Sequence, residues 1–144
     1  MHTTPKYKQV MAVFGHLGLV SLVALMLVSQ LDVTSAAVRV FGLHARDLTG
    51  DPLGNKPDPY IKVWCGSTFG GQTEYHKDTA NPSWSAEFNF PYCKCDETLK
   101  LEVWDKDMTY DDLLGTCTKL VQYGSFTVTC YLNKGTVFYR FEAK

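Results

Sequence analysis

The sequence predicts an all-β protein, an eight-stranded antiparallel β-sandwich that follows an amino-terminal signal segment. After residue 35 no helical periodicity persists for three turns, and short alternating or aromatic-rich runs are separated by turn-forming residues. The alternation is clearest over residues 99–105, where Leu99, Leu101 and Val103 share one face. One face of each sheet is therefore expected to pack against the other sheet.

The expected strands are the apolar, β-branched and aromatic runs that lie between turn signals. In order, they span residues 38–45, 60–65, 73–77, 86–92, 99–104, 114–121, 126–132 and 136–141. The separating segments are residues 49–57, Gly70-Gly71, Asn81-Pro82, Asp111-Asp112, residues 123–125 and Asn133-Lys134-Gly135. These segments are expected to form loops because glycine, proline, asparagine and aspartate favour turn conformations.

Residues 1–35 are predicted to be a secretory signal peptide, and residues 36–144 the single folded domain. Lys6 and Lys8 precede an uncharged apolar run over residues 10–28, and small residues follow at 33–37. An uncleaved anchor is the alternative, because the apolar run is nearly long enough to span a bilayer. The domain is expected to be secreted and extracellular, in an oxidising compartment.

Composition and motifs exclude several classes of function. The 144 residues include 14 basic and 15 acidic side chains, so a broad cationic surface for nucleic acid is not expected. The 13% aromatic content argues against disorder. No HExxH, GxSxG or P-loop motif is present, and neither His44 nor His76 has an adjacent nucleophile motif. The chain is therefore not expected to be an enzyme, and no catalytic residue is assigned.

Five cysteines in the folded domain predict disulfides in a small secreted protein. Cys117 and Cys130 are the preferred pair, since each lies in a short expected strand and a turn separates them. Cys93 and Cys95 are too close in sequence to favour a bond with each other, so Cys65 is expected to pair with one of them. The remaining cysteine is free or intermolecular.

Aspartates gather in two of the expected loops. Asp51 and Asp58 lie in the first loop, and the second contains Asp105, Asp107, Asp111 and Asp112. Carboxylates packed this closely repel one another unless a cation compensates their charge. Oxygen donors on irregular loops suit calcium, which accepts six to eight oxygens in flexible geometry. The sequence therefore predicts a calcium (Ca2+) site if the two loops meet.

Four motifs, in order along the chain, resemble those of C2 domains. They are Asp58-Pro59-Tyr60-Ile61-Lys62-Val63, Asn81-Pro82-Ser83-Trp84, residues 101–107 (LEVWDKD) and Asp112-Leu113-Leu114-Gly115. The stretch Leu113–Cys117, together with Val128-Thr129-Cys130, is similar to the C2 domain at the end of perforin. The resemblance implies type II strand topology and two or three Ca2+ ions between the loops. It also implies a ligand set of Asp51, Asp58, Asp105, Asp107 and Asp112, with Asp111 as an additional neighbour.

The same resemblance implies calcium-dependent binding to phospholipid membranes with anionic or zwitterionic headgroups, and a role in defence against target membranes. Thr49 and Pro52 stand where perforin has large aromatic residues, so membrane insertion is expected to depend on Leu53, Met108 and Tyr110. The alternative is a secreted interaction protein, or a lectin-like binder of a protein or microbial glycan, in which calcium only stabilises the loops. Tyrosine- and tryptophan-rich surfaces suit that alternative.

Overall fold

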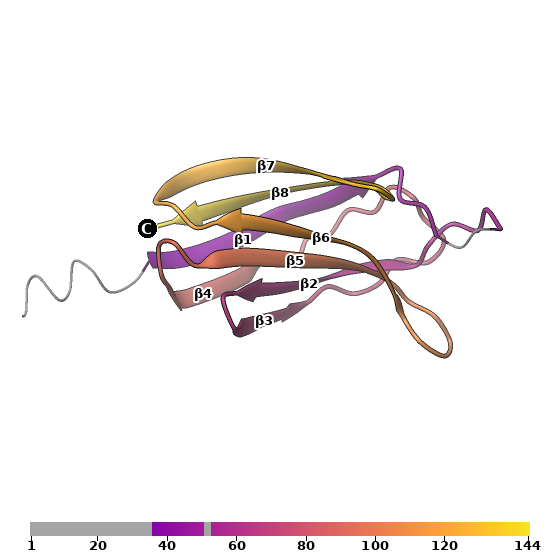
Figure 1. Ribbon diagram of the computed structural model, residues 1–144, viewed down its shortest axis with the longest axis horizontal. Helices are drawn as coiled ribbons and strands as arrows, with labels where there is room; N and C mark the ends of the chain where they lie inside the picture. The colour runs from indigo at the N-terminus through magenta and orange to yellow at the C-terminus, as the bar shows by residue number, and fades with distance from the viewer. Residues whose placement is uncertain (1–35, 51–52) are drawn as a thin grey trace, which may run out of the picture. The chain divides into compact units, whose positions relative to one another are not determined.

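The computed structural model describes residues 36–50 and 53–144 (Figure 1). The predicted signal segment and Asp51 lie outside the described residues, so the signal peptide and the ligand role of Asp51 stay predictions. The described part of the chain contains strands and no helix, and hence no helix that is long and apolar enough to cross a membrane.

The described residues form eight antiparallel strands in two four-stranded sheets, which confirms the predicted all-β sandwich. The strands are β1 (Ala36–Arg46), β2 (Pro59–Cys65), β3 (Thr68–Gln72), β4 (Phe88–Cys93), β5 (Thr98–Asp105), β6 (Asp112–Leu120), β7 (Gly124–Leu132) and β8 (Gly135–Ala143). One sheet has the order β4-β1-β8-β7 and the other the order β3-β2-β5-β6. Figure 1 shows the two sheets stacked with their strands roughly parallel to the long axis of the domain.

The core lies between the two sheets and follows the period-two pattern of the sequence. Leu99, Leu101 and Val103 of β5 are fully buried, as the alternation predicted. They share this core with Ile61 and Val63 of β2 and with inward side chains of β1 and β8, including Val38, Val40, Leu43, Val137, Tyr139 and Phe141. Burying this apolar area is the main favourable contribution to folding.

The third strand lies earlier in the chain than the sequence predicted. β3 covers Thr68–Gln72, whereas a strand was expected over residues 73–77 and a loop at Gly70-Gly71. A Cβ atom on Gly70 would lie 2.3 Å from Cζ of Phe90, and Gly71 adopts a φ of 127°. The prediction was wrong because the glycine pair was taken as a turn signal, although glycine inside a strand also marks close packing.

After β3 the chain leaves the sheet and runs toward the acidic loops. Thr73 takes the place of the next backbone pair between β3 and β2. Its side-chain Oγ1 accepts the N–H of Ile61 (2.9 Å), and its own N–H donates to the Ile61 carbonyl (2.9 Å). The buried Thr73 side chain thereby fixes where the following segment begins. That segment brings Asp78 to the end of the domain that carries Asp58.

Two disulfides join the sheets, one on each side of the sandwich. Cys117 of β6 is bonded to Cys130 of β7, and Cys65 of β2 is bonded to Cys93 of β4. Cys95 is the free cysteine of the described residues. Of the two partners expected for Cys65, the structure therefore has Cys93. Closing the shorter loop, with a separation of 13 residues, is worth about 3 kcal/mol in the chain-entropy model.

Candidate metal centre at the acidic loops

Strand pairing brings the two acidic loops together at one end of the sandwich. Asp58 immediately precedes β2, and Asp105 is the last residue of β5, opposite Pro59 in the antiparallel ladder. Asp112 begins β6 and lies opposite Asp105 on the other side. Figure 1 shows the β5–β6 loop at the same end of the domain as the segment that leads into β2. The sheet register alone therefore gathers carboxylates that are 47 residues apart in sequence.

Three of the predicted ligands form a compact cluster. Asp105, Asp107 and Asp112 each place a carboxylate oxygen within 4.8 Å of the others. Asp105 is only 5% exposed, whereas Asp107 is half-buried and Asp112 is exposed. At this spacing the carboxylates repel one another, and a divalent cation would remove that repulsion.

Backbone donors orient two of the carboxylates. Asp105 Oδ1 accepts the N–H of Asp58 at 2.8 Å, and Asp58 Oδ1 accepts the N–H of Asp78 at 2.7 Å. The carbonyl of Asp58 in turn accepts the N–H of Lys106 at 2.9 Å. These hydrogen bonds fix the positions of the carboxylates while leaving their formal charges in place, which is what a preformed cation site needs.

Asp58, Asp105 and Asp107 face an open cleft of about 510 Å³. Its lining residues are Gly54, Asn55, Lys56, Asp58, Asp78, Asp105 and Asp107. Asp78 was missed by the sequence reasoning, since one aspartate in a turn-forming segment is common and usually solvated. Its place three residues before Asn81-Pro82 was visible in the sequence, but only the fold shows that this segment reaches Asp58. The cleft thus draws acidic side chains from three loops rather than two.

Comparison with known proteins identifies the family. The family model for the C2 domain matches residues 36–130. The chain belongs to the C2 domain family. A solved structure described as "Structure of a C2 domain" has a TM-score of 0.73 and 36% identity, and the match covers 76% of this chain and 98% of that one.

The C2 domain is also similar to parts of larger proteins. Perforin-1 of Homo sapiens is 36% identical over 115 residues, which cover 76% of this chain and 20% of that protein. Extended synaptotagmin-1 of Pongo abelii is 30% identical over 110 residues, 71% of this chain and 9% of that protein. The chain therefore spans about a fifth of the length of the perforin relatives, and their similarity to it concerns this one domain.

Asp111 has a different environment from the three clustered aspartates of this C2 domain. Its Oδ2 accepts the hydroxyl of Tyr60 at 2.5 Å, its Oδ1 accepts the N–H of Asp107 at 3.1 Å, and Lys106 Nζ lies 3.8 Å away. The Tyr60 hydrogen bond is the main cause that lowers the pKa of Asp111, followed by the Asp107 N–H. Burial, and then the same hydrogen bond, raises the pKa of Tyr60. Asp111 therefore anchors the β5–β6 loop to β2 in this structure.

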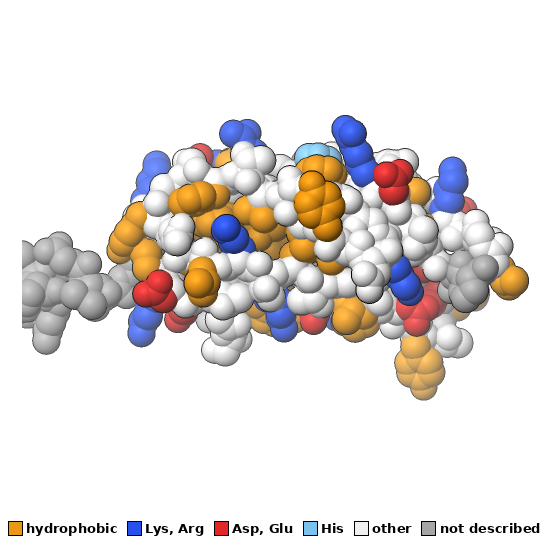
Figure 2. Space-filling model, turned by 45° about the horizontal axis from the view of Figure 1, so that its top comes forward, with side chains coloured by type: hydrophobic (Ala, Val, Ile, Leu, Met, Phe, Trp, Pro, Cys, Tyr) orange, Lys and Arg blue, Asp and Glu red, His pale blue; other side chains and the backbone are white. Residues whose placement is uncertain are grey.

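Large apolar side chains project beside the acidic cleft. Leu53, Met108 and Tyr110, which the sequence singled out for membrane insertion, are respectively 90%, 105% and 86% exposed. Figure 2 shows acidic and protruding hydrophobic side chains together at the end of the domain that carries these loops. Exposed apolar groups around a polar cleft are typical of an interaction surface.

Proposed function

We propose that this C2 domain is a secreted module that binds phospholipid membranes when Ca2+ occupies the acidic cleft. The observation that supports the proposal most strongly is the gathering of Asp58, Asp105, Asp107 and Asp112 at one end of the sandwich, beside exposed apolar side chains. The donor set is made of carboxylates, and calcium prefers such hard oxygen ligands in flexible loops. Asp51 completes the proposed ligand set, and Asp78 is added from the cleft lining.

The proposed switch is electrostatic. Without metal the cleft is strongly negative and repels anionic headgroups. Two Ca2+ ions would neutralise most of the charge of the proposed ligands and three would neutralise all of it, and lipid phosphate oxygens would then complete the coordination of the ions. Extracellular calcium modules commonly have dissociation constants of about 10⁻⁴ to 10⁻³ M, so modest affinity suffices outside cells.

The exposed apolar side chains would add contact with acyl chains. Full burial of one such side chain is worth about 1.5 to 3 kcal/mol, and partial insertion contributes less. Met108 lies between Asp107 and the rest of the β5–β6 loop, so docking at the calcium cleft would bring it to the bilayer surface. The similarity to Perforin-1 is the reason for proposing a setting in defence against target membranes.

The proposal is tested by co-sedimentation with vesicles of phosphatidylserine and phosphatidylcholine, in calcium and in chelator. Binding is expected in calcium alone. Asp107→Asn should abolish it, whereas the matched variant Asp96→Asn removes an exposed carboxylate at the opposite end of β5 and should bind normally. Met108→Ala should weaken binding more than Leu120→Ala, which removes an exposed side chain far from the cleft.

Two results would contradict the proposal. Equal vesicle binding in calcium and in chelator would remove the switch. A calcium-induced gain in stability without any lipid binding would favour the alternative, in which calcium only stabilises the loops of an interaction protein.

A further inference from the structure

A second pocket lies at the opposite end of the domain from the acidic cleft. Its volume is about 270 Å³, and its lining includes the Cys65–Cys93 disulfide, Phe69, Tyr92 and Glu97. Cys65 ends β2 and Glu97 immediately precedes β5, whereas Asp58 and Asp105 lie at the other ends of these strands. The pocket is therefore separate from the proposed calcium site.

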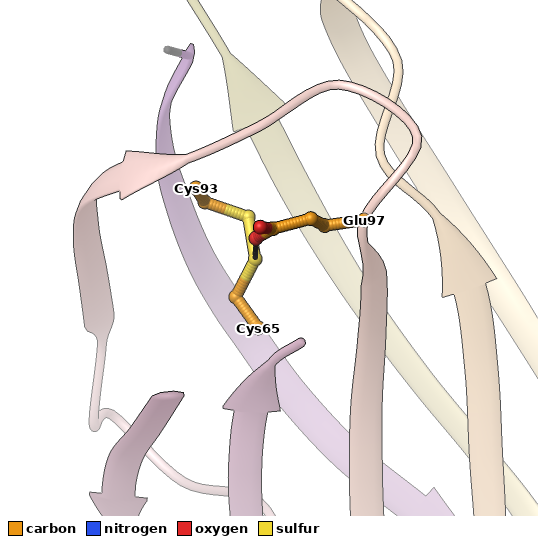
Figure 3. A group of neighbouring side chains, drawn as sticks. All are labelled: Cys65, Cys93 and Glu97. Atoms are coloured by element: carbon orange, nitrogen blue, oxygen red, sulfur yellow. Dashed lines mark hydrogen bonds between the residues drawn. A yellow bond between two sulfur atoms is a disulfide. The ribbon is translucent and has the colours of Figure 1, made fainter. Parts of the chain in front are cut away.

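Among the described residues that line this pocket, Glu97 is the only one with a charged side chain. Figure 3 shows its carboxylate reaching across from the start of β5 to the disulfide, and Oε2 lies 3.2 Å from Cys65 Sγ. A disulfide sulfur has no proton to donate, so this contact does not satisfy the carboxylate. The Lys94 N–H is a distant donor at 3.4 Å, and among the described residues no ion pair involves Glu97.

Three aromatic residues, Phe69, Phe90 and Tyr92, are among the residues that line the pocket. Phe69 is 52% exposed and its ring centroid lies 5.1 Å from that of Trp64, Tyr92 is 83% exposed, and the buried Phe90 packs against Gly70 of β3. Together with Pro91 these rings make the lining more apolar than polar. Aromatic faces attract cations, and a carboxylate among such faces gives the pocket a negative charge without a fixed counter-ion.

We propose that this pocket binds a quaternary ammonium group, such as that of choline. A primary ammonium carries three N–H donors that need acceptors, whereas a methylated ammonium needs only negative charge and apolar or π contacts. One carboxylate with aromatic walls matches the second requirement better. The volume lies just below the range of about 300 to 1,000 Å³ for drug-sized ligands, so it suits a head group rather than a larger molecule.

The test is a titration of the whole domain with choline and with ethanolamine in the presence of chelator. Binding is monitored through the amide chemical shifts of the protein. The two ligands differ only in the methyl groups on nitrogen. Saturable shifts at residues 65–70 and 92–97, with tighter binding of choline, are expected. No saturable shift up to about 100 mM choline, or tighter binding of ethanolamine, would overturn the proposal.

Matched variants separate the pocket from general surface effects. Tyr92→Ala should weaken choline binding about 2- to 30-fold, whereas Tyr131→Ala, which removes an equally exposed ring from β7, should not change it. Glu97→Gln should weaken binding about fivefold, and Glu74→Gln should have no effect. Because the Tyr92 side chain is exposed, Tyr92→Ala should fold normally. Unchanged choline affinity in both Tyr92→Ala and Glu97→Gln would refute the assignment of this pocket.

A second experiment, co-sedimentation with vesicles of pure phosphatidylcholine in chelator, distinguishes a lipid headgroup from free choline as the ligand. Co-sedimentation that Glu97→Gln reduces would identify lipid headgroups as the ligand, and binding of free choline alone would identify a small molecule. Both results support the same pocket chemistry. Because calcium is absent, failure of this experiment is distinguishable from failure of the calcium-dependent docking proposed above.

Discussion

Replacing Asp105 with asparagine should change stability in opposite directions without and with calcium. The carboxylate oxygens of Asp105, Asp107 and Asp112 lie within 4.8 Å of one another. Two unit charges at that separation repel by about 0.9 kcal/mol at the dielectric constant of water, and by about 3.5 kcal/mol at an effective constant of 20. Asparagine removes the charge but keeps an oxygen that can accept the Asp58 N–H. In chelator, Asp105→Asn should therefore raise the free energy of unfolding by about 1 to 3 kcal/mol.

With calcium the order should reverse. A ligand that binds only the native state adds about 2.7 kcal/mol at a concentration 100 times its dissociation constant. At about 10 mM Ca2+ the wild-type protein should gain an amount of this order if its dissociation constant is about 10⁻⁴ M. Asp105→Asn should lose most of that gain, because Asp105 is the most deeply buried carboxylate of the cluster.

The assay is urea unfolding followed by tryptophan fluorescence, with and without calcium, for the wild type, Asp105→Asn and the control Asp96→Asn. The control should behave like the wild type in both conditions. If Asp105→Asn is less stable than the wild type in chelator, the carboxylates do not repel one another as the geometry indicates. If it keeps the full calcium-dependent gain, Asp105 is not a ligand.

Three further predictions concern the core and the loop anchor. Tyr139→Phe should raise the free energy of unfolding by about 1 kcal/mol, because the buried hydroxyl has no hydrogen-bond partner among the described residues; a loss of stability in urea unfolding would contradict this. Burial also raises the pKa of Tyr139 to about 12, so between pH 10 and 12 the native wild type holds a proton that the unfolded chain has lost. The free energy of unfolding of the wild type should therefore fall more steeply with rising pH in this range than that of Tyr139→Phe. Gly70→Ala should cost about 1 to 3 kcal/mol through its clash with Phe90, and an unchanged melting temperature would argue against that packing. Tyr60→Phe removes the hydrogen bond to Asp111 and should cost about 1.5 to 3 kcal/mol in chelator while weakening calcium binding; equal calcium affinity in a titration would mean that this hydrogen bond does not order the loop.

The predictable part of the fold was encoded in local patterns. The alternation of Leu99, Leu101 and Val103 identified the buried face of β5, because a strand exposes successive side chains to opposite faces. Turn residues on either side of the strands located the acidic loops. The sequence could thus place Asp58 and Asp105 at strand ends, although only antiparallel pairing of β2 with β5 brings them together.

The features that sequence reasoning missed depend on tertiary contacts. Position 70 of β3 is a glycine because Phe90 leaves no room for a Cβ atom there. Nothing in the neighbouring sequence indicates this contact. Asp78 reaches Asp58 because Thr73 ends the β3 ladder and directs the chain toward the cleft. The pairing of Cys65 with Cys93 rather than Cys95 likewise depends on the packing of the two sheets, because Cys65 ends β2 in one sheet and Cys93 ends β4 in the other.

Calorimetric titration of the protein with Ca2+ measures directly whether aspartates from separate loops share divalent ions. The wild type is expected to bind about two or three ions with dissociation constants of about 10⁻⁴ to 10⁻³ M, and Asp107→Asn to lose at least one of them. Absence of calcium binding at millimolar concentrations, or an identical isotherm for Asp107→Asn, would show that these aspartates do not form the calcium site.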